Sequence, residues 1–93
     1  IAYDRYTGRY GSAFNLPPEA AETRAMRACG SPGCQIVSRV PSGSCAALYS
    51  TLNGRGWGTA VRRTRDAART AAQGACQTYA HGECLARVTD CSR

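Results

Sequence analysis

Hydrophobic and polar positions alternate at the start of the chain and then change to a helical spacing. The alternation predicts strands at residues 1–6 and 9–14, joined by a tight turn. Alanine then recurs every three or four positions over residues 18–29, which predicts a helix with one apolar face. Apolar residues return over residues 34–40 and predict a third strand.

The second half of the chain shows the same order of patterns. Strands are predicted at residues 45–52 and 57–61, and Asn53-Gly54 between them is a strong signal for a hairpin turn. A helix is predicted after Thr64, and a last strand at residues 83–91. Each half is therefore expected to contain two strands, a helix and a third strand.

A shift of 47 positions superimposes the two halves. The shift matches residues of the same kind, placing Trp57 on Tyr10, Gly58 on Gly11, Ala60 on Ala13, Val61 on Phe14 and Cys76 on Cys29. With small gaps it also matches Cys34 with Cys84, Cys45 with Cys91, and Ile1-Ala2-Tyr3 with Ala47-Leu48-Tyr49. We therefore expect an α+β fold in which two tandem β-β-α-β repeats, residues 1–44 and 45–93, form one small disulfide-stapled domain with an antiparallel sheet.

The expected helices have recognisable ends and narrow inward faces. Pro18 stands where proline is favoured at a helix start, and Gly30 follows the last turn as a C-cap. Thr64 is the expected N-cap of the second helix. The inward faces consist of small residues: Ala21, Ala25, Ala28 and Cys29 in the first helix, and Ala68, Ala72, Ala75 and Cys76 in the second. Small side chains there allow a helix and a sheet to approach closely.

Six cysteines in 93 residues indicate a disulfide framework, because large apolar residues are few and the core must be thin. A pairing that respects the repeat joins Cys29 to Cys34, Cys76 to Cys84 and Cys45 to Cys91. In the symmetric alternative, Cys29 pairs with Cys76 and Cys34 with Cys84. Either framework indicates an oxidising compartment, so we expect a secreted or periplasmic protein.

No apolar run in the sequence approaches the length of a transmembrane helix, and no signal peptide is recognisable. The chain starts at Ile1 instead of methionine, so we expect that a leader was removed. The oligomeric state has no signature in the sequence.

The chain is basic, with a net charge of +6, and all twelve of its basic residues are arginine. Four of them surround the start of the second helix and a fifth lies one hairpin away; the set is Arg55, Arg62, Arg63, Arg65 and Arg69. The planar guanidinium group of arginine suits carboxylate and phosphate groups. This cluster is therefore the candidate binding surface, for a protein or an anionic envelope component. A solvated, non-functional basic face is the alternative. Nucleic acid is disfavoured, because the aromatic residues do not interleave with the arginines.

Other groups of residues are weaker candidates for a metal, catalytic or phosphate-binding site. Cys76, His81, Cys84 and Cys91 have the ligand types of a Cys₃His zinc site, although not a standard spacing. His81 is also the one histidine that could serve a Cys–His nucleophile, but the expected disulfides leave no free thiol. The segment Gly54-Arg55-Gly56-Trp57-Gly58 lacks the context of a phosphate loop, so its glycines are assigned to hairpin geometry and Trp57 to the core. We predict no catalytic residues and no cofactor.

Several of these motifs together resemble a known bacterial family. They are Ile1-Ala2-Tyr3, Thr7-Gly8-Arg9-Tyr10-Gly11, the Ala20/Ala21/Ala25…Cys29 helix, Gly33-Cys34-Gln35-Ile36-Val37, Cys45-Ala46-Ala47-Leu48 and Gly56-Trp57-Gly58. In this order they are similar to the domain of unknown function 4189, a family of small exported proteins of mycobacteria and many proteobacteria. Members of that family usually begin Tyr/Trp-Gly-Ala-Ile-Ala, and only Ile-Ala remains here, which suggests trimming just upstream of Ile1.

The resemblance implies export and a cysteine-stapled domain, and it supplies no catalytic residues. Some mycobacterial members are implicated in interactions with the host. We therefore expect a non-enzymatic binding domain, either a host-directed effector, and thus a virulence factor, or an inhibitor or immunity-type protein. The alternatives are a zinc-stabilised, redox or hydrolytic small enzyme and a purely structural envelope protein.

Overall fold

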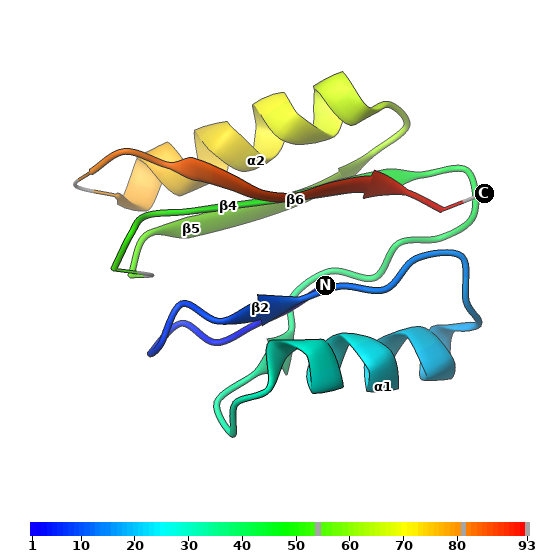
Figure 1. The fold of residues 1–93 in the computed structure, drawn as a ribbon. Helices are drawn as coiled ribbons and strands as arrows, with labels where there is room; N and C mark the ends of the chain where they lie inside the picture. Colours follow the sequence, from blue (N-terminus) through cyan, green and yellow to red (C-terminus); the bar gives the residue numbers. More distant parts are fainter. Residues whose placement is uncertain (54, 81, 93) are drawn as a thin grey trace.

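Four layers make up the fold in the computed structural model, which describes residues 1–53, 55–80 and 82–92. Two antiparallel sheets of three strands lie face to face, and one helix covers the outer side of each sheet (Figure 1). The predicted α+β class with antiparallel pairing is confirmed, with two separate sheets in place of one. The turn residue Gly54 lies outside the described residues.

The first half of the chain forms the smaller sheet and its helix. Its elements are β1 (Ala2–Tyr3), β2 (Tyr10–Gly11), α1 (Pro18–Cys29) and β3 (Gln35–Ile36). The strand order is β2-β1-β3, with β1 in the centre and both neighbours antiparallel to it. These strands are much shorter than the predicted segments at residues 1–6, 9–14 and 34–40.

The second half forms the larger sheet. Its elements are β4 (Cys45–Ser50), β5 (Trp57–Arg62), α2 (Arg65–Tyr79) and β6 (Leu85–Cys91). The strand order is β5-β4-β6, so the central strand is again the first strand of its half. Both halves thus share one order of elements and one order of strands; their origin as tandem repeats stays a prediction.

Capping residues set the helix ends where the sequence predicted. Gly30 adopts the left-handed conformation with φ 70°, and its N–H donates to the carbonyl of Met26 at 3.0 Å. The Thr64 hydroxyl accepts from the backbone N–H of Ala67 at 3.1 Å. Both caps satisfy backbone groups that the helix itself leaves unpaired.

The small inward faces of the helices are confirmed in part. Ala25 and Cys29 in α1 are buried, as are Ala68, Ala72 and Cys76 in α2. Ala28 is exposed, contrary to prediction. The two-residue strands of the first sheet cover less of α1 than the longer strands cover of α2, so Ala28 stays at the edge of the contact.

Each helix backbone approaches its sheet at one glycine. A methyl group on Gly58 would lie 2.3 Å from the backbone nitrogen of Cys76 and 2.6 Å from the carbonyl oxygen of Ala72. A methyl group on Gly11 would lie 2.4 Å from the nitrogen of Cys29 and 2.3 Å from the oxygen of Ala25. No side chain fits at those distances, so both sheets require glycine here. The two contacts are related by the shift of 47 positions seen in the sequence.

A third apolar cluster holds the two sheets together. Ile1, Tyr3, Ala46 and Leu48 are buried between them, and the half-buried Trp57 packs against this cluster. The rings of Tyr3 and Trp57 lie 5.1 Å apart at an angle of 37°. The predicted role of Trp57 as a core anchor is confirmed.

The strand pairing corrects the match between Ile1-Ala2-Tyr3 and Ala47-Leu48-Tyr49. Ala2 pairs with Gly11, and Tyr49 pairs with the corresponding glycine, Gly58. Ala2 therefore occupies the position of Tyr49, and Ile1 that of Leu48, one residue further than the sequence match. A shift of one residue exchanges the two faces of a strand, so similarity of residue type along so short a strand was a poor guide.

The three disulfides are Cys29–Cys34, Cys76–Cys84 and Cys45–Cys91, with Cα atoms 6.3, 6.2 and 3.8 Å apart. The first of the two predicted frameworks is confirmed. The Cys29–Cys34 and Cys76–Cys84 bridges join the end of a helix to the start of the following strand, and Cys45–Cys91 joins β4 to β6. Each bridge contributes about 2–4 kcal/mol, mainly by constraining the unfolded chain.

The turn after β1 is built on a buried carboxylate. Asp4 is only 2% exposed and accepts hydrogen bonds from the Ser31 hydroxyl and from the backbone N–H groups of Tyr6 at 2.8 Å and Thr7 at 3.3 Å. The bond from Ser31, helped by the backbone bonds, lowers the pKa of the Asp4 carboxyl below its ordinary value, although burial acts in the opposite direction.

The close contact at Gly58 predicts that Gly58→Ala destabilises the fold by about 1–3 kcal/mol, because the new methyl group forces α2 away from β5. Gly74→Ala is the matched control: it lies in α2 with open space around it and should stabilise by about 0.5–1 kcal/mol. Urea unfolding of both variants measures the difference. Equal stability of the two variants would contradict the contact.

The lowered pKa of Asp4 predicts a specific loss of stability in acid. The stabilisation is present above the ordinary carboxyl pKa of 3.8 and is lost as the pH falls through the lower folded-state pKa. Asp4→Asn should therefore be less stable than the native chain at neutral pH, and the difference should shrink in acid. Unfolding midpoints across pH test this, with the exposed Glu83→Gln as control. A difference that does not depend on pH would refute the assignment.

Candidate functional site

Four of the five predicted arginines lie together where β5 passes into α2. Arg62 ends β5, Arg63 lies in the connection, and Arg65 and Arg69 occupy the first turns of α2, one turn apart. All four side chains are exposed. The Thr64 cap fixes this helix start, so the connection holds the four residues at one end of the second sheet. We call Arg62, Arg63, Arg65 and Arg69 the arginine face.

Three members of the arginine face have partners within the fold. Arg65 forms an ion pair with Asp90 of β6 at 3.2 Å, and Arg62 donates to the carbonyl of Val61 at 2.7 Å. A hydrogen bond with the Tyr49 hydroxyl raises the pKa of Arg69 above its ordinary value. The Arg63 guanidinium forms no hydrogen bond or ion pair with the residues that the structure describes. The face is thus partly ordered by its own fold and keeps unneutralised positive charge.

Arg55 does not join the arginine face. It lies in the β4–β5 connection, at the opposite end of β5 from Arg62. Its neighbours there include Leu52 and Tyr79, which are 87% and 74% exposed. Spacing along the chain suggested proximity, but a six-residue strand separates the two ends by about 20 Å. Arg55 therefore belongs to a different surface, with apolar and aromatic neighbours.

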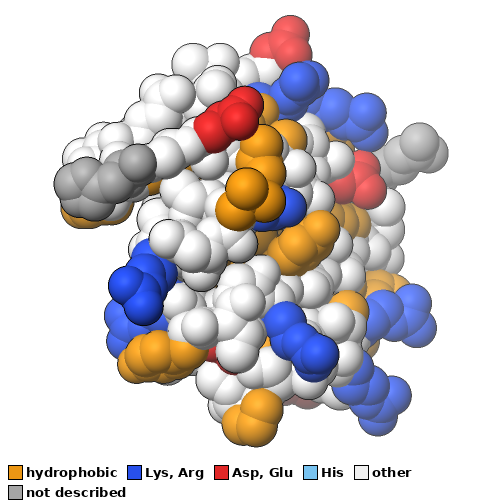
Figure 2. Space-filling model, turned by 60° about the vertical axis from the view of Figure 1, so that its left-hand side comes forward, with side chains coloured by type: hydrophobic (Ala, Val, Ile, Leu, Met, Phe, Trp, Pro, Cys, Tyr) orange, Lys and Arg blue, Asp and Glu red, His pale blue; other side chains and the backbone are white. Residues whose placement is uncertain are grey.

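The other arginines are spread over the molecule. On the face drawn in Figure 2, basic side chains occupy several separate places, and acidic side chains lie beside some of them. The net charge of +6 is thus distributed over the surface, and the arginine face is distinguished by four arginines within eight consecutive residues.

The proposed zinc ligands are not available as a set. Cys76 and Cys84 are bonded to each other, and Cys91 is bonded to Cys45. Zinc binds thiolates, and a disulfide sulfur has no thiolate form to offer. The fourth ligand, His81, lies outside the described residues. The disulfides therefore contradict the zinc alternative, because none of its three cysteines is a free thiol.

Thiol exchange requires an accessible disulfide. Cys29 and Cys34, the pair with the shortest loop, are 2% and 5% exposed. A nucleophilic thiolate cannot reach buried sulfurs without local opening of the fold. The burial of this bridge favours a structural role.

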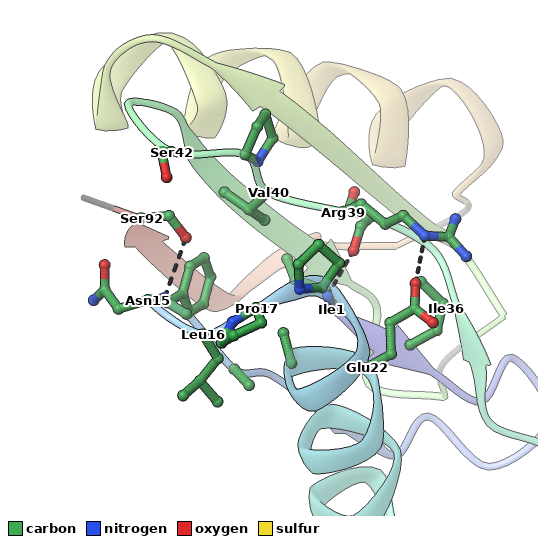
Figure 3. Close-up of a pocket in the computed structure, with 16 residues that line it drawn as sticks. Ile1, Asn15, Leu16, Pro17, Glu22, Ile36, Arg39, Val40, Ser42 and Ser92 are labelled. Atoms are coloured by element: carbon green, nitrogen blue, oxygen red, sulfur yellow. Dashed lines mark hydrogen bonds and ion pairs between the residues drawn. The ribbon is translucent and has the colours of Figure 1, made fainter.

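The first half of the molecule contains a groove that the sequence analysis did not predict. It has a volume of about 680 Å³ and lies at the amino end of β1, between the chain leaving β2, the chain leaving β3 and the start of α1 (Figure 3). Its walls are mostly apolar, with Ile1, Phe14, Leu16, Val40 and Pro41 among the lining residues. No sequence motif marks it, because its walls come from segments far apart in the chain.

Polar groups lie at one side of the groove. The Ile1 ammonium donates to the carbonyl of Ser38 at 2.8 Å, and burial lowers its pKa. Beside it, Arg39 and Glu22 form an ion pair at 2.5 Å, which Figure 3 shows. The groove therefore combines apolar walls with polar groups at one side.

Comparison with known proteins places the chain in a family. No helix in the described residues is long and apolar enough to cross a membrane. No curated protein and no solved structure gives a significant match. The model of the family described as Domain of unknown function (DUF4189) matches residues 1–91, nearly the whole chain. The resemblance noted in the sequence is thereby confirmed, and the chain belongs to the DUF4189 family.

Proposed function

We propose that the chain is a non-enzymatic binding domain of an oxidising compartment, secreted or periplasmic, and that it contacts an acidic protein through the arginine face. The observation that carries the proposal is the arrangement of four exposed arginines at one fixed helix start. Three formed disulfides support the oxidising compartment.

The arginine face has the properties of a recognition surface for carboxylates. Arg65 already pairs with one carboxylate, that of Asp90, and this ion pair supports the choice of a carboxylate partner. Arg63 and Arg62 have donors left for a second one. The N-terminus of α2 adds a partial positive charge at the same place. Attraction between such a face and acidic residues accelerates encounter and weakens as salt rises.

An acidic protein segment suits this face better than a flat anionic surface. Its charges lie on a strand end, a connection and two helical turns, which curve around one end of the sheet. Separate carboxylates on a folded partner can follow that curvature. Anionic lipid headgroups or an envelope polymer remain the second outcome of the test.

Neutralising the arginine face should weaken binding of an acidic partner. The triple variant Arg62→Gln, Arg63→Gln, Arg69→Gln is compared with Arg5→Gln, Arg24→Gln, Arg27→Gln, which removes the same charge from the first half. A glutamate-rich peptide serves as the probe, in a fluorescence titration at low salt. We expect at least about tenfold weaker binding, near 1.4 kcal/mol, for the first variant and a much smaller loss for the second.

Equal weakening by the two variants would show that only net charge matters and would refute the arginine face. Vesicles with and without anionic lipid are titrated in parallel. Binding to anionic vesicles that exceeds binding to the peptide, and that depends on the same three residues, would replace the protein partner by a membrane surface.

A further inference from the structure

One edge of the second sheet is open along β5. This strand pairs only with β4, and the order β5-β4-β6 places it at the edge of the sheet. Among the residues that the structure describes, no strand lies on its outer side. An edge strand presents N–H and carbonyl groups with which an extended peptide can pair.

The unpaired groups of this edge can be identified from the turn that precedes β5. The Thr51 N–H donates to the carbonyl of Gly56 at 2.9 Å, so these two residues form a hydrogen-bonded pair. In an antiparallel ladder such pairs recur at every second residue, so the even-numbered residues of β5 bond to β4. The odd-numbered residues direct their N–H and carbonyl groups outward; they are Trp57, Thr59 and Val61. In the described part of the chain, the main-chain groups of Trp57 and Thr59 form no hydrogen bond.

Arg62 lies on this open edge. Its guanidinium donates to the outward-pointing carbonyl of Val61 at 2.7 Å. The positive charge of the arginine face therefore continues onto the outer side of β5. A carboxylate on an added strand can replace the Val61 carbonyl as the acceptor, because hydrogen bonds between charged groups are the stronger ones.

A second arginine stands at the other end of the same edge. Arg55 precedes Trp57 by two residues, whereas Arg62 ends the strand. A segment that follows β5 over its whole length is about 20 Å long. Carboxylates at the two ends of such a segment can reach Arg55 and Arg62 at the same time.

Half-buried apolar side chains flank the edge on both sides. Trp57 and Val61 pack against the cluster between the sheets and are only half-buried. On the helix side, a methyl group on Gly58 would lie 2.7 Å from the Cβ of Ala75, which is also half-buried. An added strand would cover these side chains further, so its middle residues should be apolar or β-branched.

We propose that an acidic, extended segment of a partner protein adds to the outer edge of β5 as a fourth strand of the second sheet. Main-chain hydrogen bonds with Trp57 and Thr59 hold the segment, and carboxylates at its ends meet Arg62 and Arg55. This strand addition rests on the proposed function, because it describes how an acidic partner reaches the arginine face. It adds the conformation of the partner and a role for Arg55.

The probe is the peptide Glu-Glu-Thr-Val-Thr-Val-Glu-Glu, acetylated and amidated at its ends. The control peptide Glu-Glu-Thr-Pro-Pro-Val-Glu-Glu carries the same charge, but its adjacent prolines remove a main-chain donor from each side of the strand. Both are titrated at low salt into isotope-labelled protein and followed by NMR. We expect the first peptide to bind at least about tenfold more tightly than the control.

Amide hydrogen exchange with saturating peptide identifies the strand that is paired. Exchange at Thr59, whose N–H points outward, should slow at least about tenfold, because the added strand accepts its hydrogen bond. Ala60 already pairs with β4 and is the internal control, at which exchange should change little. Unchanged exchange at Thr59 with peptide bound would overturn strand addition.

The variant Arg55→Gln tests the far end of the segment. It should weaken binding of the first peptide about threefold, the effect of one exposed charge pair. Arg24→Gln removes an exposed arginine of α1 and should leave the affinity nearly unchanged. Equal affinities of the two variants would contradict the contact with Arg55.

The outcomes distinguish strand addition from the proposed function. If both peptides bind equally well, and their binding depends on Arg62, Arg63 and Arg69, strand addition fails and the arginine face stands. If neither peptide binds up to about 1 mM at low salt, both fail.

Discussion

The close approach of each helix to its sheet at a single glycine is the constraint on which the structure depends. At Gly11 and Gly58 the helix backbone lies where a side chain would otherwise stand. Only small residues fit between helix and strands at that separation, which is why Ala25, Cys29, Ala72 and their neighbours form the inner faces. Such thin layers bury little apolar surface, and disulfides at the helix ends compensate for it.

Both halves have this close contact, but the strands of the second sheet are longer than those of the first. The positions of the arginine face and the groove follow from this difference in length. The second sheet is long, so α2 begins beyond its edge and presents the arginine face there. The first sheet is short, so the chain leaving β2 and the chain leaving β3 diverge around the amino end of β1 and enclose the groove. One half thus presents exposed arginines at an end of its sheet, and the other encloses a mostly apolar groove.

Local signals in the sequence predicted local features well. The proline at the start of α1, Gly30 at its end and the Thr64 cap defined the helices, and short loops between cysteines favoured the observed bridges. Packing between distant segments was not predictable in the same way. The face-to-face sheets, the register of β1 and the groove depend on contacts such as Tyr3 with Trp57, which no local pattern encodes. The sequence analysis grouped Arg55 with the arginine face for the same reason, because residues that are close in the chain can lie at opposite ends of a strand.

The central claim is that a single glycine sets the separation of helix and sheet in each half of the chain. Urea unfolding of Gly11→Ala beside the Gly74→Ala control tests it most directly, because it measures the free energy of unfolding of each variant. We predict that Gly11→Ala destabilises the fold by about 1–3 kcal/mol, because the new methyl group would meet the backbone of α1. A Gly11→Ala variant as stable as the control would contradict the claim.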